Sequence, residues 1–143
     1  MTNNADILKA AAIFIDDKGR LLISKDKGAA KWTILGGRIE DGETQIECLH
    51  REIKEELDMQ MDINKVVGIY TSPNYVLDFG GNKVFQPFVV AFLCTPKSKK
   101  FRINKESTEA KWFNIDKISE LDLFPNTENI INQALNKKQT HFD

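Results

Sequence analysis

Apolar residues recur along this chain in short runs and alternations that are typical of strands. These runs predict strands over residues 7–16, 20–25, 66–77, 83–94 and 110–115. Residues 78–82 read as a hairpin connection, and Pro73 marks a bulge, an edge or a strand end. A short apolar segment, 32–35, leads into Gly36 and Gly37, and we expect a glycine-containing turn over residues 37–43, directly before a helix.

Helical spacing predicts two helices. Thr44 is followed three residues later by Glu47, which fits a capping box, so the first helix should begin at about Gln45. Its buried face is expected to comprise Ile46, Leu49, Ile53 and Leu57. The second helix should run from Asn126 or Thr127 to about residue 137. Its inward residues are expected to be Ile130, Ile131 and Leu135.

The composition limits the fold and the class of function. With 143 residues, 41% of them apolar and 29% charged, the chain is expected to form one soluble domain over residues 1–143. Predicted strands outnumber predicted helices, which favours an α+β fold with helices covering a mixed sheet. A net charge of −1 argues against broad binding to nucleic acid.

Targeting signals and cysteine usage suggest where the protein works. The chain shows no signal peptide and no apolar run long enough to span a membrane, so we expect no membrane partner. Cys48 and Cys94 lack metal-ligand spacing and read as reduced, buried thiols. These features predict a cytoplasmic protein.

Three acids on the first predicted helix carry the clearest chemical signal. Glu52, Glu55 and Glu56 stand at i, i+3 and i+4, so their carboxylates are expected to converge. The alternative is a solvated helix face on which Arg51 and Lys54 offset the acids. However, like charges at contacting spacings repel, and acids in the last helical turn oppose the helix dipole. A bound divalent cation, Mg²⁺ first, would offset both costs.

Residues 37–59 resemble the Nudix box. Its fixed residues appear here as Gly37, Glu43 and the run Arg51-Glu52-Ile53-Lys54-Glu55-Glu56. The resemblance implies an α/β/α sandwich. It also implies that Glu52, Glu55, Glu56 and the Gly36 carbonyl bind Mg²⁺, with Mn²⁺ as a substitute. By the same resemblance Glu52 would also help to activate the attacking water, and Arg51 and Glu43 would orient the box acids.

Two positions depart from the usual family pattern. Asp58 stands where most members have glycine, and Leu35 stands where most have proline. A glycine at the first position would end the helix in a left-handed conformation, which aspartate adopts less readily. Neither position supplies a metal-binding carboxylate, so both concern local geometry.

Residues outside the box are candidates for substrate binding. Arg38 is a candidate phosphate contact, with an ordinary surface arginine as the alternative. Glu106 and Glu109 match a loop in which several family members place an extra metal ligand or a base, and a solvated loop acid is the alternative for each. Stacking on a base or sugar is open to Tyr75, Phe79, Phe85 and Phe88, although a core or cross-strand role is the alternative for each. Neither His50, within the predicted helix, nor His141, in a tail, is expected to be catalytic.

The resemblance implies hydrolysis of a nucleoside diphosphate linked to a moiety X. Nucleoside triphosphates, including oxidised ones, are the first expectation, and ADP-ribose or another nucleotide sugar is the next. A non-catalytic ligand sensor on the same fold is a third hypothesis. An RNA-decapping enzyme is a fourth, for which the basic residues of 97–102 would supply a patch. Family members are often dimers, so a homodimer is also implied.

Overall fold

A computed structural model describes residues 7–74, 76–78, 84–98, 100–104, 108–136 and 139–143. A mixed five-stranded sheet lies at its centre. The strand order is β3 (Leu35–Arg38), β1 (Ile7–Phe14), β7 (Pro87–Pro96), β4 (Met61–Tyr70) and β9 (His141–Phe142). β1 pairs parallel with β7 and antiparallel with β3. β4 pairs antiparallel with β7 and parallel with β9.

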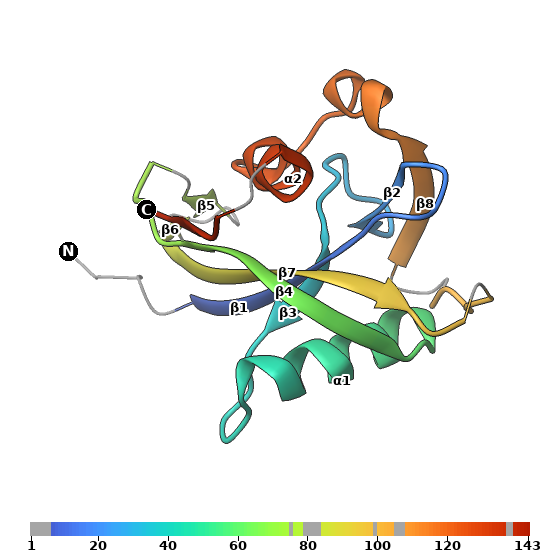
Figure 1. The fold of residues 1–143 in the computed structure, drawn as a ribbon. Coiled ribbons are helices and arrows are strands. Elements are labelled where there is room, and N and C mark those ends of the chain that lie inside the picture. Colours follow the sequence, from blue (N-terminus) through green and yellow to red (C-terminus); the bar gives the residue numbers. More distant parts are fainter. Residues whose placement is uncertain (1–6, 75, 79–83, 99, 105–107, 137–138) are drawn as a thin grey trace.

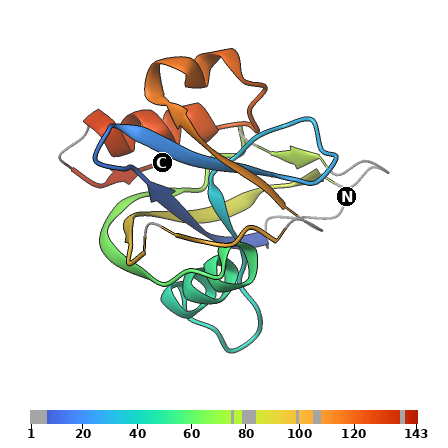
Figure 2. The same cartoon turned by 90° about the vertical axis from the view of Figure 1, so that its right-hand side faces the viewer.

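The remaining elements flank this sheet. An antiparallel pair is formed by β2 (Arg20–Asp26) and β8 (Thr108–Asn114), and a short hairpin by β5 (Leu77–Asp78) and β6 (Val84–Phe85). A 3₁₀ helix spans Ile115–Glu120. Helix α1 (Gln45–Leu57) covers one face of the sheet and α2 (Thr127–Asn136) lies on the other, as Figures 1 and 2 show. This arrangement confirms the α+β, α/β/α expectation.

Strand β1 lies between β3 and β7, and from Ala10 to Phe14 it is buried on both faces because a helix covers each side of the sheet. Successive side chains of a strand point to opposite faces. Ala10 and Phe14 accordingly pack in the cluster beneath α1, while Ala11 and Ile13 pack in the cluster beneath α2. Such two-sided burial explains why β1 reads as an almost continuous apolar run.

Helix α1 begins as the sequence predicts. The Thr44 hydroxyl accepts a hydrogen bond from the Glu47 amide at 3.1 Å, and the Glu47 carboxylate accepts one from the Thr44 amide at 3.0 Å. The buried face includes Cys48, but Ile46 is 42% exposed, so its prediction as a core residue is wrong. Helical spacing gives the direction of a side chain, whereas burial also requires that a neighbouring layer extend that far.

The two departures from the box pattern fit their local structure. Asp58 ends α1 in the left-handed region, with φ 48° and ψ 45°, and its amide donates to the Lys54 carbonyl at 2.9 Å. It therefore adopts the conformation that glycine usually supplies at this position. Leu35 begins β3 and is buried in the cluster beneath α1.

Several element boundaries differ from the prediction. Strand β4 spans Met61–Tyr70 rather than residues 66–77, so Pro73 lies beyond its end, and β7 spans Pro87–Pro96 rather than 83–94. The expected turn before α1 is present at Asp41 and Gly42, whereas Gly36 and Gly37 belong to strand β3 because their backbone pairs with β1. His141 lies in strand β9 rather than in a tail. Among the described residues, no helix is both long enough and apolar enough to cross a membrane.

Candidate functional site

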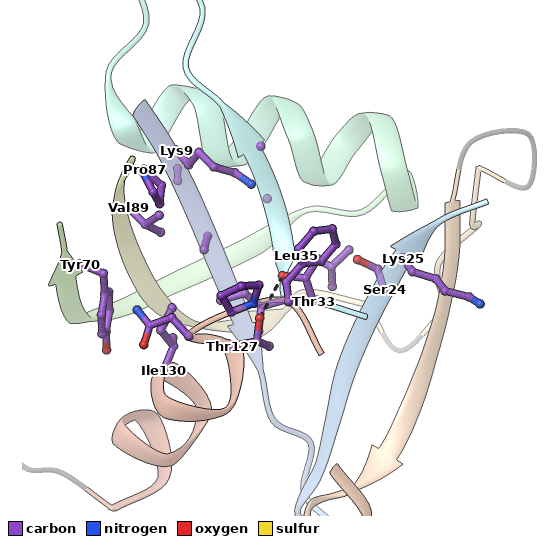
Figure 3. Close-up of a pocket in the computed structure, with 18 of the residues that line it drawn as sticks. Lys9, Ser24, Lys25, Thr33, Leu35, Tyr70, Pro87, Val89, Thr127 and Ile130 are labelled. Carbon is purple, nitrogen blue, oxygen red and sulfur yellow. Dashed lines mark hydrogen bonds between the residues drawn. The ribbon is translucent and has the colours of Figure 1, made fainter. Parts of the chain in front are cut away.

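A cavity of about 190 Å³ opens between the sheet and the start of α2. Its size is many times the roughly 10–15 Å³ that one water molecule needs, so it has room for an organic ligand. Figure 3 shows that its walls come from strands far apart in the sequence and from α2. Residues around it include Lys9, Asp26, Thr33, Gly36, Gly37, Glu56, Tyr70 and Thr127.

The cavity has a charged region and a neutral region. Glu56 and Asp26 supply carboxylates, and the charges of both act on Lys9. Elsewhere the wall carries neutral hydroxyls, and the Thr33 and Thr127 oxygens lie 3.5 Å apart (Figure 3). The arrangement suits a ligand whose anionic part binds through a cation held by the carboxylates, and whose neutral part forms hydrogen bonds with the hydroxyls.

Two glycines of β3 allow close packing at this edge of the sheet, one against α1 and the other against β1. A Cβ atom on Gly37 would lie 2.3 Å from the Glu52 Cδ atom, so only glycine leaves room for that carboxylate. Gly36 has φ 138°, and a Cβ atom there would lie 2.0 Å from the Ala10 carbonyl oxygen. Gly37 therefore lets the acid-bearing helix pack directly against β3, and Gly36 lets β3 lie close to the backbone of β1.

Arg51 connects the acids at the outer side of α1. Its guanidinium bonds to both oxygens of Glu43, with Nε to Oε2 at 2.6 Å and Nη2 to Oε1 at 2.9 Å. Nη1 donates to Glu52 at 2.9 Å and to Glu55 at 3.3 Å. The hydrogen bonds between Arg51 and Glu43 lower the pKa of Glu43 to about 2. Glu43 thus fixes the position of the Arg51 guanidinium, and Arg51 in turn holds the Glu52 carboxylate, because a guanidinium can donate several hydrogen bonds at once.

Glu56 is the one box glutamate that lines the cavity. Burial, together with the nearby carboxylates of Glu52, Asp26 and Glu55, raises the pKa of Glu56 to about 8. Burial likewise raises the pKa of Glu52, against the opposing effect of Arg51. Carboxylates gathered away from water favour a bound cation, since a cation offsets both desolvation and mutual repulsion.

The donor set fits a hard divalent cation, although the side chains are spread in this structure. Among the described residues, no three Asp, Glu, His or Cys side chains converge closely enough to hold a metal ion. Arg51 draws Glu52 and Glu55 toward itself, and Glu55 has 58% of its side chain exposed. The oxygen chemistry and the raised pKa of Glu56 fit Mg²⁺, so the ligand assignment to Glu52, Glu55, Glu56 and the Gly36 carbonyl stays a prediction.

Other predicted binding residues have different surroundings. Arg38 is exposed on β3 and does not line the cavity, although its carbonyl accepts a hydrogen bond from Arg51 at 3.0 Å. Glu109 is exposed and pairs with Lys25 at 3.2 Å. Glu106, Tyr75 and Phe79 lie outside the described residues. Phe88 is 39% exposed, and His50 is exposed on α1.

Several cavity residues have no clear signal in the sequence. The wall is completed by Lys9, Asp26, Thr33, Tyr70 and Thr127. A lysine inside the apolar run of β1 is the one sequence feature that marks an unusual position. The threonines meet across a separation of 94 residues, so pairing of segments, rather than any local pattern, brings them together.

Comparisons with known proteins agree with this geometry. The family model described as NUDIX domain matches residues 7–134. A nucleoside triphosphatase, NudI, of Enterobacter sp. (strain 638) is 28% identical over 117 residues, which are 76% of this chain and 83% of that protein. A MutT-like protein of Streptomyces ambofaciens is 25% identical over 113 residues, which are 79% of this chain and 67% of that protein. An ADP-ribose pyrophosphatase from Streptococcus suis has the same fold, with a TM-score of 0.73 and 18% identity. The match covers 96% of this chain and 98% of that protein.

Proposed function

Because this chain belongs to the Nudix hydrolase family, we propose that it hydrolyses nucleoside diphosphates linked to a moiety X, with Mg²⁺ as its cofactor. Nucleoside triphosphates are the first substrate class. The likeness to a nucleoside triphosphatase over 83% of that protein's length supports this choice.

One observation carries the proposal: Glu56 of the box helix faces a cavity that also presents neutral hydroxyls. A nucleotide has the matching two-part chemistry. Its phosphates need a positive charge, which a cation bound by ionised carboxylates would supply. Its base and sugar need hydrogen bonds and apolar contact. The region near Glu56 and Asp26 is therefore assigned to the phosphates, and the region near Thr33 and Thr127 to the nucleoside.

In the proposed reaction, a water oxygen forms a bond to one phosphorus of the diphosphate, and the bridging P–O bond breaks. The products are a nucleoside monophosphate and phosphorylated X, or pyrophosphate when X ends in phosphates. Bound Mg²⁺ would supply charge neutralisation of the phosphates and acidification of the water. The protein orients these groups: Arg51 holds Glu43 and Glu52 in place, and Gly37 leaves room for the Glu52 carboxylate.

A hydrolysis screen tests the substrate class. Nucleoside triphosphates, ADP-ribose, diadenosine polyphosphates and capped RNA are incubated with the protein, with and without Mg²⁺, and the products are separated by chromatography. We expect Mg²⁺-dependent release of nucleoside monophosphate and pyrophosphate from triphosphates. Faster turnover of ADP-ribose would favour the nucleotide-sugar alternative. No turnover of any compound would favour a ligand-sensing role and contradict the proposal.

Glu56→Gln tests whether the cavity carboxylate takes part. The substitution keeps the shape of the side chain and removes its charge, so turnover should fall by about a hundredfold or more while the fold persists. Glu128→Gln, an exposed glutamate on α2, is the matched control and should retain wild-type rates. Wild-type turnover in Glu56→Gln would remove this carboxylate from the reaction.

A further inference from the structure

Lys9 is a charged residue in an otherwise apolar central strand. Its strand neighbours Ala10 and Ala11 are buried, and Lys9 lies opposite Arg38 on one side and Val89 on the other. Lysine rarely occupies such a position unless a partner compensates its charge. Here the side chain lines the cavity, and Figure 3 shows it extending from its strand across the cavity wall.

The ammonium group has acids in its surroundings but no direct ion pair. Within the described part of the chain, no carboxylate oxygen lies within 4.0 Å of the Lys9 Nζ atom. Burial lowers the pKa of Lys9, while Asp26, Glu52 and Glu56 act more weakly in the opposite direction. A desolvated cation that faces an open cavity without a direct partner fits an anionic ligand there.

Lys25 provides an internal comparison. It also borders the cavity, but its Nζ atom lies 3.2 Å from a Glu109 oxygen and 5.0 Å from the centre of the Trp32 ring. In Figure 3 its side chain points away from the other labelled residues. Lys25 is thus satisfied by protein groups, whereas Lys9 remains available to a ligand.

The position of Lys9 indicates which part of a nucleotide it would meet. Lys9, Val89 and Tyr70 form one cross-strand row, since Val89 pairs with Lys9 on one side and with Tyr70 on the other. All three line the cavity. The charges of Glu56 and Asp26 also reach Lys9. Tyr70 and Val89 offer the aromatic and apolar surface that a base or sugar needs, so Lys9 lies where this part of the wall meets the region assigned to the phosphates.

We propose that Lys9 binds the phosphoryl group adjacent to the nucleoside, in the substrate and in the nucleoside monophosphate product. This inference rests on the proposed nucleotide hydrolysis and adds a residue that selects for a phosphorylated nucleoside. An ammonium–phosphate contact in a partly dry cavity is stronger than one at an exposed surface. A nucleoside without phosphate lacks this contact, so Lys9 should raise the affinity for a phosphorylated nucleoside over that for the nucleoside alone.

Calorimetric titration without divalent metal tests the inference separately from catalysis. AMP, GMP, adenosine, guanosine and inorganic phosphate are titrated in EDTA into the wild type, Lys9→Met, Lys9→Arg and Lys111→Met, the last at an exposed lysine of β8 that does not line the cavity. We expect Lys9→Met to weaken monophosphate binding about tenfold or more and to leave nucleoside binding unchanged. Lys9→Arg should retain most of the affinity because it keeps the charge, and Lys111→Met should match the wild type.

Equal monophosphate affinity in the wild type and Lys9→Met would overturn the inference, as would a wild type that binds no monophosphate. If the loss extends to inorganic phosphate alone and not to the monophosphates, Lys9 serves a separate anion site and the inference fails. Thermal unfolding shows whether each variant is folded, and Lys9→Gln replaces Lys9→Met if the latter is not. A protein that hydrolyses nothing but shows the Lys9-dependent difference would contradict the proposed function and leave this inference standing.

Discussion

Glu55 and Glu56 are adjacent in sequence, yet their surroundings differ sharply. Glu55 is exposed and bonds to Arg51, whereas Glu56 lines the cavity beside the charges of Glu52 and Asp26. Successive residues of an α-helix point about 100° apart, so the Glu55 side chain faces solvent while the Glu56 side chain faces the cavity. The acids of the box are therefore unequal, and Glu56 carries the largest electrostatic cost in the absence of metal.

This cost predicts how stability changes with pH. The pKa of Glu56 is raised from 4.5 to about 8 by burial. The metal-free folded protein therefore keeps a proton that the unfolded chain releases between about pH 4.5 and pH 8. The free energy of unfolding should fall as pH rises through this window, by up to about 1.4 kcal/mol per pH unit.

Urea unfolding in EDTA at several pH values measures this effect. Glu56→Gln should remove most of the fall in unfolding free energy between about pH 4.5 and pH 8, and it should be more stable than the wild type at pH 8. Glu128→Gln serves as the control and should retain the full pH dependence, because Glu128 is exposed on α2 and has no effect on the pKa of Glu56. Identical pH profiles for the wild type and Glu56→Gln would show that Glu56 is not buried as a protonated acid.

At the scale of elements, the site depends on the close packing of α1 against β3. Gly37→Ala is expected to displace the Glu52 carboxylate, because the new Cβ atom would lie 2.3 Å from its Cδ atom. A displacement of about 1 Å at a reacting centre can cost on the order of a hundredfold in rate, so kcat/KM should fall by tenfold or more.

Gly28→Ala gives a control for the glycine prediction. Gly28 has φ 82° and no atom within 4 Å of an added Cβ, so alanine there strains the backbone without touching α1. Gly28→Ala should lower the melting temperature and leave kcat/KM nearly unchanged. If Gly37→Ala keeps wild-type kcat/KM, the close approach of helix and strand is not needed for activity.

At the scale of the whole molecule, strand β9 joins the C-terminal segment to the sheet and to α2. The His141 ring stacks on Tyr70 with centroids 5.0 Å apart, and its Nδ1 atom lies 3.0 Å from Gln133 Nε2. Tyr70 also lines the cavity. The contacts of β9 therefore support one wall of the proposed nucleoside region.

His141→Ala should lower the free energy of unfolding by about 1–2 kcal/mol, through loss of the ring contact and one hydrogen bond. It should also weaken nucleoside binding, because Tyr70 loses its stacking partner. His50→Ala is the matched control: His50 is exposed on α1, so the change should stay within about 0.5 kcal/mol. Equal stability of the two variants, measured by urea unfolding, would show that β9 does not support this wall.

The sequence was sufficient for features that depend on local spacing. The start of α1 at its capping box and the sheet with a helix on each face are confirmed. The prediction failed where a neighbouring layer decides the outcome, as at exposed Ile46 and at Gly37 of β3. The cavity could not be predicted, since Lys9, Thr33 and Thr127 meet only after distant segments have packed.

The central claim is that Glu56 and its neighbouring acids hold a divalent cation at the cavity. Titration of Mn²⁺ followed by electron paramagnetic resonance measures this directly, because bound Mn²⁺ loses the sharp signal of the free ion. We expect the wild type and Glu128→Gln to bind Mn²⁺ equally, and Glu56→Gln to bind it about tenfold or more weakly. Equal Mn²⁺ affinity in Glu56→Gln and the wild type would contradict the account.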